Sequence, residues 1–232
     1  MKKILIAAIL FLISLGASAV APLTRYELKV GDFDELKVVD GINVEYVCDR
    51  SRAGTVEFET TRELASAVIF EPSKGKLSIK LTARETPYEG LPLVRVYSSQ
   101  LQSASNEGDS LLRIKSLPQN VRFSCRVIGN GTLAVRDVCV GNIKASILSG
   151  RGVIALDGRC DKASLKVTGA GVIQADDLQA TDVSCTLTGT GVINCYATSL
   201  LDVGGLGGKV FYRGTPELKK RFLSTVKVNP ID

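Results

Sequence analysis

The sequence contains 232 residues, of which 29 are basic and 24 acidic, for a formal net charge of +5. It has no histidine, which excludes Ser–His and Cys–His catalysis. It also has no Cys-x-x-Cys pair, which together with the lack of histidine argues against a zinc site. We expect no metal and no cofactor. The charges are ordinary for a protein surface and are not interleaved with aromatic residues, so we expect no nucleic-acid partner.

Residues 1–19 have the pattern of a secretory signal peptide. Lys2 and Lys3 form a basic start, residues 4–15 form an apolar run, and Ala17 and Ala19 frame a small-residue cleavage site. The apolar run is short for a membrane span and no second long one follows, so the mature chain is expected to lack a transmembrane segment. We therefore expect an exported protein, located in the periplasm, at the outer surface or outside the cell.

Residues 20–93 are predicted to form an N-terminal β section. Alternating apolar and polar residues predict strands over 26–30, 33–38, 44–47, 55–60, 68–71 and 77–81. One helical turn is predicted over 61–67, with Thr61 as its cap and Glu63 in the first turn. Two prolines and a glycine within residues 83–92 suit a boundary before the next section.

Residues 94–214 carry a Gly-x-Gly repeat, and residues 106–108 resemble a degenerate first copy of it. The clear copies begin at Gly129, Gly150, Gly169 and Gly189, so the period is about 20 residues. No GK[ST] follows any copy and no helix pattern comes after it, which favours structural glycines over a phosphate-binding loop. A short period rich in β-branched residues is typical of a β-solenoid.

Aligning the copies on the first glycine separates two faces, because successive side chains of a strand point to opposite sides. Even offsets are mostly apolar and are expected to line the interior; odd offsets are expected to point outward. Like residues at one offset require in-register parallel pairing between coils. The predicted fold is all-β, a right-handed parallel β-helix-like solenoid with coils of about 20 residues. Two columns illustrate the assignment: inward Val127, Leu148, Val167 and Leu187, and outward Arg126, Ile147, Lys166 and Thr186.

Residues 215–232 are predicted to cap the C-terminal end, since an open solenoid end must be covered. Residues 216–223 suit a short amphipathic cap, with Lys219, Lys220 and Arg221 as its solvated face.

The cysteines can be placed by the same columns. Cys139 and Cys160 share an offset in consecutive repeats, so their backbones should lie about 5 Å apart, and a disulfide between them is predicted. Cys125 and Cys185 also share an offset but lie three coils apart, roughly 14 Å, which is too far for a bond. We expect them to be buried as small apolar residues.

Several segments, in this order, resemble the bacterial head GIN domain family, exported proteins of Bacteroides-type bacteria described as adhesins. The segments are 32–36 (DFDEL), 41–44 (GINV), 76–79 (KLSI), the serial Gly-x-Gly repeats, and 212–216 (YRGTP). The resemblance covers nearly the whole mature chain and implies a β-helix-like fold. The chain lacks a C-terminal run of amphipathic barrel strands, so it is not expected to translocate itself as an autotransporter does.

The first functional hypothesis is a non-enzymatic binding or adhesion module, in which outward residues near the glycine turns contact a protein, a glycan or a second copy of the chain. The alternative is that these columns reflect only β-propensity and packing. The candidate residues are Ser149, Thr168 and Thr188 before the turn and Val153, Val172 and Val192 after it.

The second hypothesis is a carbohydrate-active enzyme, which would need paired carboxylates held on one face. Asp157 and Asp176 share an outward offset in adjacent coils, with Arg136 one coil earlier and Asp177 alongside. The alternative is that these are ordinary turn aspartates. A cell-envelope scaffold is a further alternative, whereas a threonine-ladder ice or mineral binder would need two threonine columns, and the sequence has one.

Overall fold

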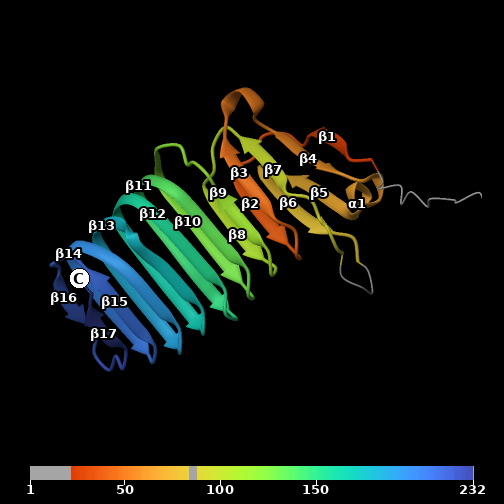
Figure 1. Ribbon diagram of the computed structural model, residues 1–232. Helices are drawn as coiled ribbons and strands as arrows, with labels where there is room; N and C mark the ends of the chain where they lie inside the picture. The colour runs from red at the N-terminus through yellow and green to blue at the C-terminus, as the bar shows by residue number, and fades with distance from the viewer. Residues whose placement is uncertain (1–21, 84–87, 232) are drawn as a thin grey trace, which may run out of the picture.

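The computed structural model describes residues 22–83 and 88–231, so the predicted signal peptide lies outside the described residues. Within them the chain forms one coiled sheet of 17 strands with two short helices. The strands stack as rungs from the N-terminal end, where α1 and β1 lie, to the C-terminal end (Figure 1). The elements are β1 (Thr24–Lys29), β2 (Glu35–Val39), β3 (Val44–Cys48), η1 (Arg50–Arg52), β4 (Thr55–Thr60), α1 (Arg62–Ala67), β5 (Val68–Ser73), β6 (Lys76–Leu81), β7 (Val94–Ser98), β8 (Ser103–Glu107), β9 (Leu111–Ile114), β10 (Asn120–Ile128), β11 (Thr132–Ser149), β12 (Val153–Gly169), β13 (Val172–Gly189), β14 (Val192–Leu206), β15 (Lys209–Arg213), β16 (Glu217–Lys220) and β17 (Lys227–Pro230).

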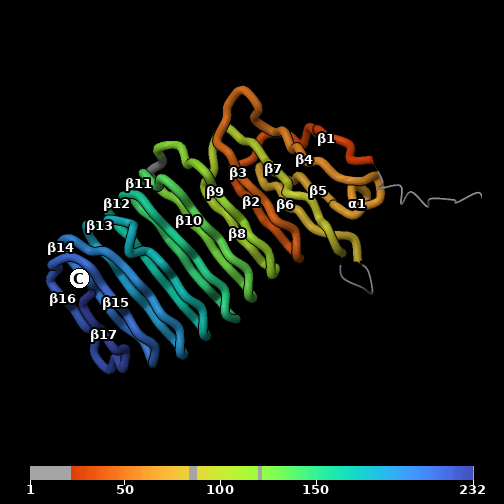
Figure 2. Tube along the Cα trace, viewed as in Figure 1, coloured from red at the N-terminus to blue at the C-terminus, as the bar shows by residue number. Residues whose placement is uncertain are grey.

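The repeats pair in parallel, coil upon coil. Leu133 in β11 lies opposite Ile154 in β12, which lies opposite Ile173 in β13 and then Ile193 in β14. All four side chains are fully buried, and the tube trace shows each coil laid on the previous one (Figure 2). The predicted all-β solenoid with coils of about 20 residues is confirmed.

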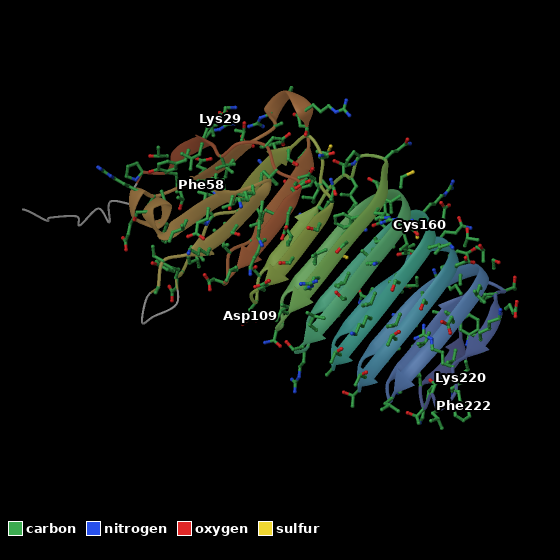
Figure 3. All side chains as sticks on the ribbon, turned by 180° about the vertical axis from the view of Figure 1, so that it is seen from behind. Lys29, Phe58, Asp109, Cys160, Lys220 and Phe222 are labelled. Carbon is green, nitrogen blue, oxygen red and sulfur yellow. The ribbon has the colours of Figure 1, made fainter. Side chains whose placement is uncertain are left out.

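The coils of β11, β12 and β13 each turn at three places. One is the Gly-x-Gly turn; the other two are marked by breaks in the inward–outward alternation, where two successive residues point out. In the third repeat these breaks fall at Asp176–Asp177 and at Thr181–Asp182, with buried Leu178 and Ala180 between them. A coil therefore has a segment after the glycine turn, a short middle segment, and a long segment before the next turn. Asp109, beside the glycine turns, and Cys160, in a middle segment, lie at opposite edges of the stack (Figure 3).

The glycines are structural. Gly150 has a φ of +82°, and a Cβ there would lie 2.2 Å from the Gly129 carbonyl oxygen of the previous coil. A Cβ at Gly152 would lie 2.4 Å from Cγ1 of Val127. Left-handed backbone and close contact between coils both require a residue without a Cβ.

The N-terminal section continues the solenoid by a route that the sequence does not display. β2 pairs in parallel with both β6 and β8, and β3 pairs with both β7 and β9. The β2–β3 coil thus lies between the β6–β7 and β8–β9 coils. β1, β4 and β5 form antiparallel pairs at this end. The predicted helical turn is confirmed as α1, capped by the Thr61 side chain.

The degenerate first copy is a true coil. β8 pairs with β10 and β9 with β11, in register with the later repeats. Asn106 is fully buried at its turn, and its amide donates hydrogen bonds to the carbonyl oxygens of Ser110 (2.7 Å) and Thr132 (3.0 Å). A buried amide satisfied in this way holds the turn, at the position that Val127 occupies in the next coil.

One predicted column is wrong in the second repeat. β10 and β11 pair Val127 with Ile147 and then Ile128 with Ser149, so Leu148 is an extra residue in a bulge. Ile147 is therefore fully buried, whereas Leu148 is 37% exposed and points outward. Ser146, one residue earlier, takes the outward position that the alignment had given to Ile147. A bulge adds one residue to the strand, so the residues before it point to the opposite side from the one that the glycine alignment predicts.

The C-terminal segment completes the last coil with strands. β16 pairs with β14, and β17 pairs with β15. Of the three cations predicted to be solvated, Arg221 instead donates to Asp202, Thr186 and Ser184. Phe222 and Leu223, just after β16, remain 92% and 76% exposed; Figure 3 shows Phe222 at the tip of this end. Among the described residues, no helix has the length and apolar character needed to cross a membrane.

Candidate functional site

The most distinctive surface is a patch of five cations on the long segments of three adjacent coils, which we call the basic face. Parallel pairing aligns Arg122 with Asn142 and Lys162, Ser124 with Lys144 and Ser164, and Arg126 with Ser146 and Lys166. Cations therefore alternate with serine or asparagine both along and across the strands. The basic face consists of Arg122, Arg126, Lys144, Lys162 and Lys166, all exposed.

The pairing register fixes the dimensions of the basic face. Residues four apart on one strand are separated by about 13 Å, and strands two apart by about 10 Å. Four of the cations thus have their Cα atoms at the corners of a rectangle of about 10 by 13 Å, with Lys144 at its centre. The corner residues are Arg122, Arg126, Lys162 and Lys166. Such an arrangement concentrates positive potential over a flat, rigid surface.

None of these five side chains forms an ion pair or a side-chain hydrogen bond with any other residue that the structure describes. The outward positions between them are Ser124, Asn142, Ser146 and Ser164, so no carboxylate lies within the pattern. The bordering acids include Asp161, next to Lys162 in the chain, and Asp182, opposite Lys162 on β13.

A hollow of about 510 Å³ lies at one side of the basic face. Arg122 and Lys144 supply two cations to its wall, and Ser124, Asn142 and Gln102 supply neutral polar groups. The Gln102 amide also donates to Asp34 at 3.1 Å, which places one acid behind this wall. The hollow thus combines positive charge with hydrogen-bonding groups.

A second group of cations, at the N-terminal end, is fully engaged. The Glu45 carboxylate, with a side chain only 3% exposed, contacts Arg95 (2.9 Å), Lys115 (3.0 Å) and Arg113 (3.7 Å). Burial by itself would raise the pKa of Glu45, but the hydrogen bonds from Lys115 and Arg95 outweigh it and hold that pKa below its ordinary value. These cations neutralise a buried charge, unlike those of the basic face.

Glu57 makes a similar cluster on β4, which lies on the other side of β7 from β3. Its carboxylate contacts Arg52 (2.7 Å) and Arg25 (2.8 Å) and accepts a hydrogen bond from the Tyr97 hydroxyl. The hydrogen bond from Arg52, followed by that from Tyr97, lowers the pKa of Glu57 to about 2. The cluster joins β1, η1, β4 and β7, which is a structural role.

The predicted interaction columns lie on both sides of the glycine turn. Val153, Val172 and Val192 pair in register and are half-buried. Thr168 pairs with Thr188, at the end of the long segments that carry the basic face, and Ser149 is exposed at the same turn. The turn separates the two columns, so the valines belong to a different segment from the Ser/Thr column.

The carboxylate pair is not formed as predicted. β12 and β13 pair Asp157 with Asp177, which leaves Asp176 one residue out of register. One Asp157 oxygen binds Arg136 at 2.7 Å, and the other accepts from the Asp137 backbone N–H at 2.8 Å. Asp137 has a φ of +52°, so Asp157 stabilises a left-handed corner.

The disulfide predicted between Cys139 and Cys160 is also absent, and both cysteines are free. Val135 pairs with Leu156 and Val138 with Gly158, so β11 has one residue more than β12 in this corner. Cys160 therefore pairs with Val140, and Cys139 pairs with Arg159. Cys160 is consequently buried and Cys139 exposed. The interior positions of Cys125 and Cys185 are as expected.

Both cysteines line a hollow of about 550 Å³ along the middle segments. Arg159 and Asp161 are its charged residues. Among residues 22–83 and 88–231, no group of three or more potential metal ligands is found.

The basic face was missed from the sequence, although two of its members were visible. Arg126 and Lys166 appeared in one outward column, separated by Ile147. The bulge at Leu148 had to be known before Ser146 could replace Ile147 and Lys144 could be placed between the two strands.

Comparison with known families agrees with this architecture. Residues 32–216 match the family described as "Putative auto-transporter adhesin, head GIN domain". The chain belongs to this head GIN domain family. The resemblance drawn from the DFDEL, GINV and YRGTP segments is thereby confirmed, and the matched residues span both the N-terminal section and the repeats.

Solved structures of similar fold come from Bacteroides and Parabacteroides species. A putative adhesin from Bacteroides fragilis NCTC 9343 has a TM-score of 0.81 at 19% identity, covering 90% of this chain and 97% of that chain. A putative lipid binding protein from Parabacteroides distasonis ATCC 8503 has a TM-score of 0.73 at 24% identity, with 90% and 97% covered. A putative adhesin from Parabacteroides merdae ATCC 43184 has a TM-score of 0.73 at 18% identity, with 90% and 96% covered. These likenesses concern the fold alone. No curated protein sequence matches the chain.

Proposed function

We propose that this head GIN domain protein is a non-enzymatic binding module of the adhesin type, exported to the periplasm or the cell surface. The observation that carries the proposal is the basic face, where five exposed cations lie in a fixed pattern with no partner among the described residues. Unneutralised like charges repel one another, so their retention on a rigid surface points to a role in recognition.

The geometry favours binding over chemistry. Asp157, the better placed of the two candidate catalytic carboxylates, is bonded to Arg136 and to the Asp137 backbone. An acid in two such bonds has a structural role, whereas a glycosidase needs a carboxyl pair free to face a sugar. The family description as an adhesin supports the same reading.

The proposal is tested by screening the exported chain against an array of host and bacterial glycans, matrix proteins and lipid vesicles. The same samples are analysed for new reducing ends and unsaturated sugars. We expect specific binding to at least one class and unchanged glycans. Product formation that disappears in Asp157→Asn or Asp176→Asn would overturn the proposal in favour of an enzyme. Absence of binding throughout would overturn it in favour of a scaffold within the cell envelope.

A further inference from the structure

From the basic face we infer the chemical class of the ligand: a linear acidic polysaccharide, carrying carboxylate or sulfate groups, that lies across β10, β11 and β12. This inference rests on the proposed binding function and specifies its site. The site consists of Arg122, Arg126, Lys144, Lys162 and Lys166, with the intervening Ser124, Asn142, Ser146 and Ser164.

The first argument is the repetition of charge. A polymer with one anionic group on each sugar or on alternate sugars presents charges at regular intervals, as the basic face does. Lys144 is central, and the corner cations are each about 8 Å from it by strand geometry. A polymer crossing the face can therefore meet three cations along either diagonal: Arg122, Lys144 and Lys166, or Arg126, Lys144 and Lys162.

The second argument is the chemistry between the charges. Serine hydroxyls both donate and accept hydrogen bonds, and an asparagine amide offers two donors and an acceptor. These groups match the hydroxyls of a sugar, which need both donors and acceptors, better than they match a bare anion. The hollow beside Arg122 and Lys144, with Ser124 and Asn142 in its wall, can receive one ring substituent.

The third argument concerns the other polyanions. Single-stranded nucleic acid is held by stacking on aromatic side chains, and a membrane surface is met by Trp, Phe or Leu beside the basic residues. The outward residues of the pattern are Lys, Arg, Ser and Asn, and Phe123, the aromatic residue beneath the hollow, is 1% exposed. Leu148, 37% exposed at the bulge beyond Ser146, is an apolar residue at the edge of the basic face, but the pattern itself is polar, which favours a hydrated polysaccharide.

The contrast with the Glu45 cluster supports the assignment. There, Arg95, Arg113 and Lys115 all contact one buried carboxylate and are held in place by it. On the basic face no carboxylate of the described residues binds the cations, so an anionic ligand can take that role. Removing these cations therefore costs no internal ion pair, which makes them suitable for mutation.

The test measures binding of the full exported chain to dextran sulfate, polygalacturonate and uncharged dextran. We expect binding to one or both acidic polymers, none to dextran, and an affinity that falls steeply as NaCl is raised, because counterions compete for the cations. The triple variant Lys144→Ser, Lys162→Ser, Lys166→Ser should lose at least thirtyfold in affinity. Sulfate and carboxylate are distinguished by which polymer binds.

A matched control removes three exposed lysines elsewhere: Lys209→Ser, Lys220→Ser, Lys227→Ser. It changes the net charge equally and should alter affinity less than threefold. Equal losses in both triple variants would overturn the inference, since net charge alone would then explain binding. Tighter binding to anionic phospholipid vesicles than to either polysaccharide, lost in the first triple variant, would overturn it in favour of a membrane. Specific binding of another array ligand that survives this variant would leave the binding module in place and refute the site.

Discussion

The carbonyl oxygen of Gly129 lies 2.2 Å from the position that a Cβ on Gly150 would occupy. This distance is well inside van der Waals contact, and the atom that would be struck belongs to the backbone and cannot rotate away. The two coils therefore cannot stack with a side chain at this position. A similar contact recurs two coils later, where a Cβ at Gly189 would lie 2.5 Å from the Gly169 oxygen; in the coil between them, a Cβ at Gly169 would lie 3.3 Å from the Gly150 oxygen. Glycine at these turns therefore permits the close stacking that the hydrogen bonds between coils require.

Gly150→Ala should lower the free energy of unfolding by about 3 kcal/mol or more, because the new Cβ adds a backbone clash to the strain of φ at +82°. Gly31→Ala is the matched control: its φ is +80°, but nothing lies within 4 Å of the added Cβ. There we expect only the left-handed penalty, about 1 kcal/mol. Urea unfolding followed by circular dichroism measures both, and equal losses would show that the contact between coils is relaxed at little cost.

The Glu57 cluster predicts a specific pH dependence. The folded pKa is about 2, below the ordinary glutamate value, so the ionised form is stabilised by folding. This contribution is fully present above the unfolded pKa of about 4.3 and is lost as the pH falls towards 2. Glu57→Gln should therefore destabilise the protein by about 2 kcal/mol at pH 6, and by progressively less below pH 4.

The measurement compares urea unfolding of the wild type and Glu57→Gln from pH 6 to pH 2.5. Glu59→Gln is the control, since Glu59 is exposed on the same strand and forms no ion pair with a described residue. Its effect should stay small at every pH. A Glu57→Gln difference that does not change with pH would mean that packing of the side chain matters and its charge does not.

The two cysteines of the middle segments should differ sharply in reactivity. Cys139 is exposed, whereas Cys160 is buried and burial raises the pKa of its thiol to about 12. The reactive thiolate is thus scarce and shielded at Cys160. Alkylation of the folded protein with iodoacetamide, mapped by peptide mass, should label Cys139 many times faster than Cys160 or the fully interior Cys125. Recovery of a Cys139–Cys160 disulfide peptide from non-reduced protein would contradict the register between β11 and β12.

The limits of the sequence are visible in these same residues. Period, glycine turns and inward columns predict the solenoid because every coil buries its own strip of apolar side chains, as at Ile154 and Ile173. What a period cannot show is a single-residue change of register. The bulge at Leu148 and the corner at Asp137 each shift a strand by one position, which moved Ile147 inward and separated Cys139 from Cys160. A surface site consists of residues from several strands, so its prediction requires the correct register between them. One shift of this kind is enough to prevent the basic face from being predicted.

The N-terminal section shows a second limit. The β2–β3 coil lies between two coils that follow it in the chain, so its partners are 41 to 50 residues away on one side and 68 on the other. No repeat pattern indicates this order, because apolar and polar residues alternate along each strand in the same way whichever strands it pairs with. The strands were predictable and their pairing was not.

The C-terminal end provides the last prediction. Arg221 follows β16 and reaches back over two coils: its guanidinium binds Asp202 at 2.7 Å, Ser184 at 2.8 Å and Thr186 at 3.1 Å. The aliphatic part of its side chain lies over Gly204, where a Cβ would be 2.5 Å from Cδ of Arg221. The side chain therefore ties β16, which pairs with β14 in the sheet, to the body of the solenoid.

Arg221→Ala should loosen β16 without unfolding the solenoid. The pair with Asp202 is partly exposed, so we expect a global loss of only about 1 kcal/mol. Locally, amide exchange over residues 217–221 should accelerate at least tenfold, because terminal strands open independently of the core. Lys220→Ala is the control, since Lys220 is exposed and makes no ion pair with a described residue. Exchange that accelerates equally in β16 and in β12 would show that Arg221 supports the whole solenoid, and unchanged exchange would show that backbone pairing with β14 holds the end unaided.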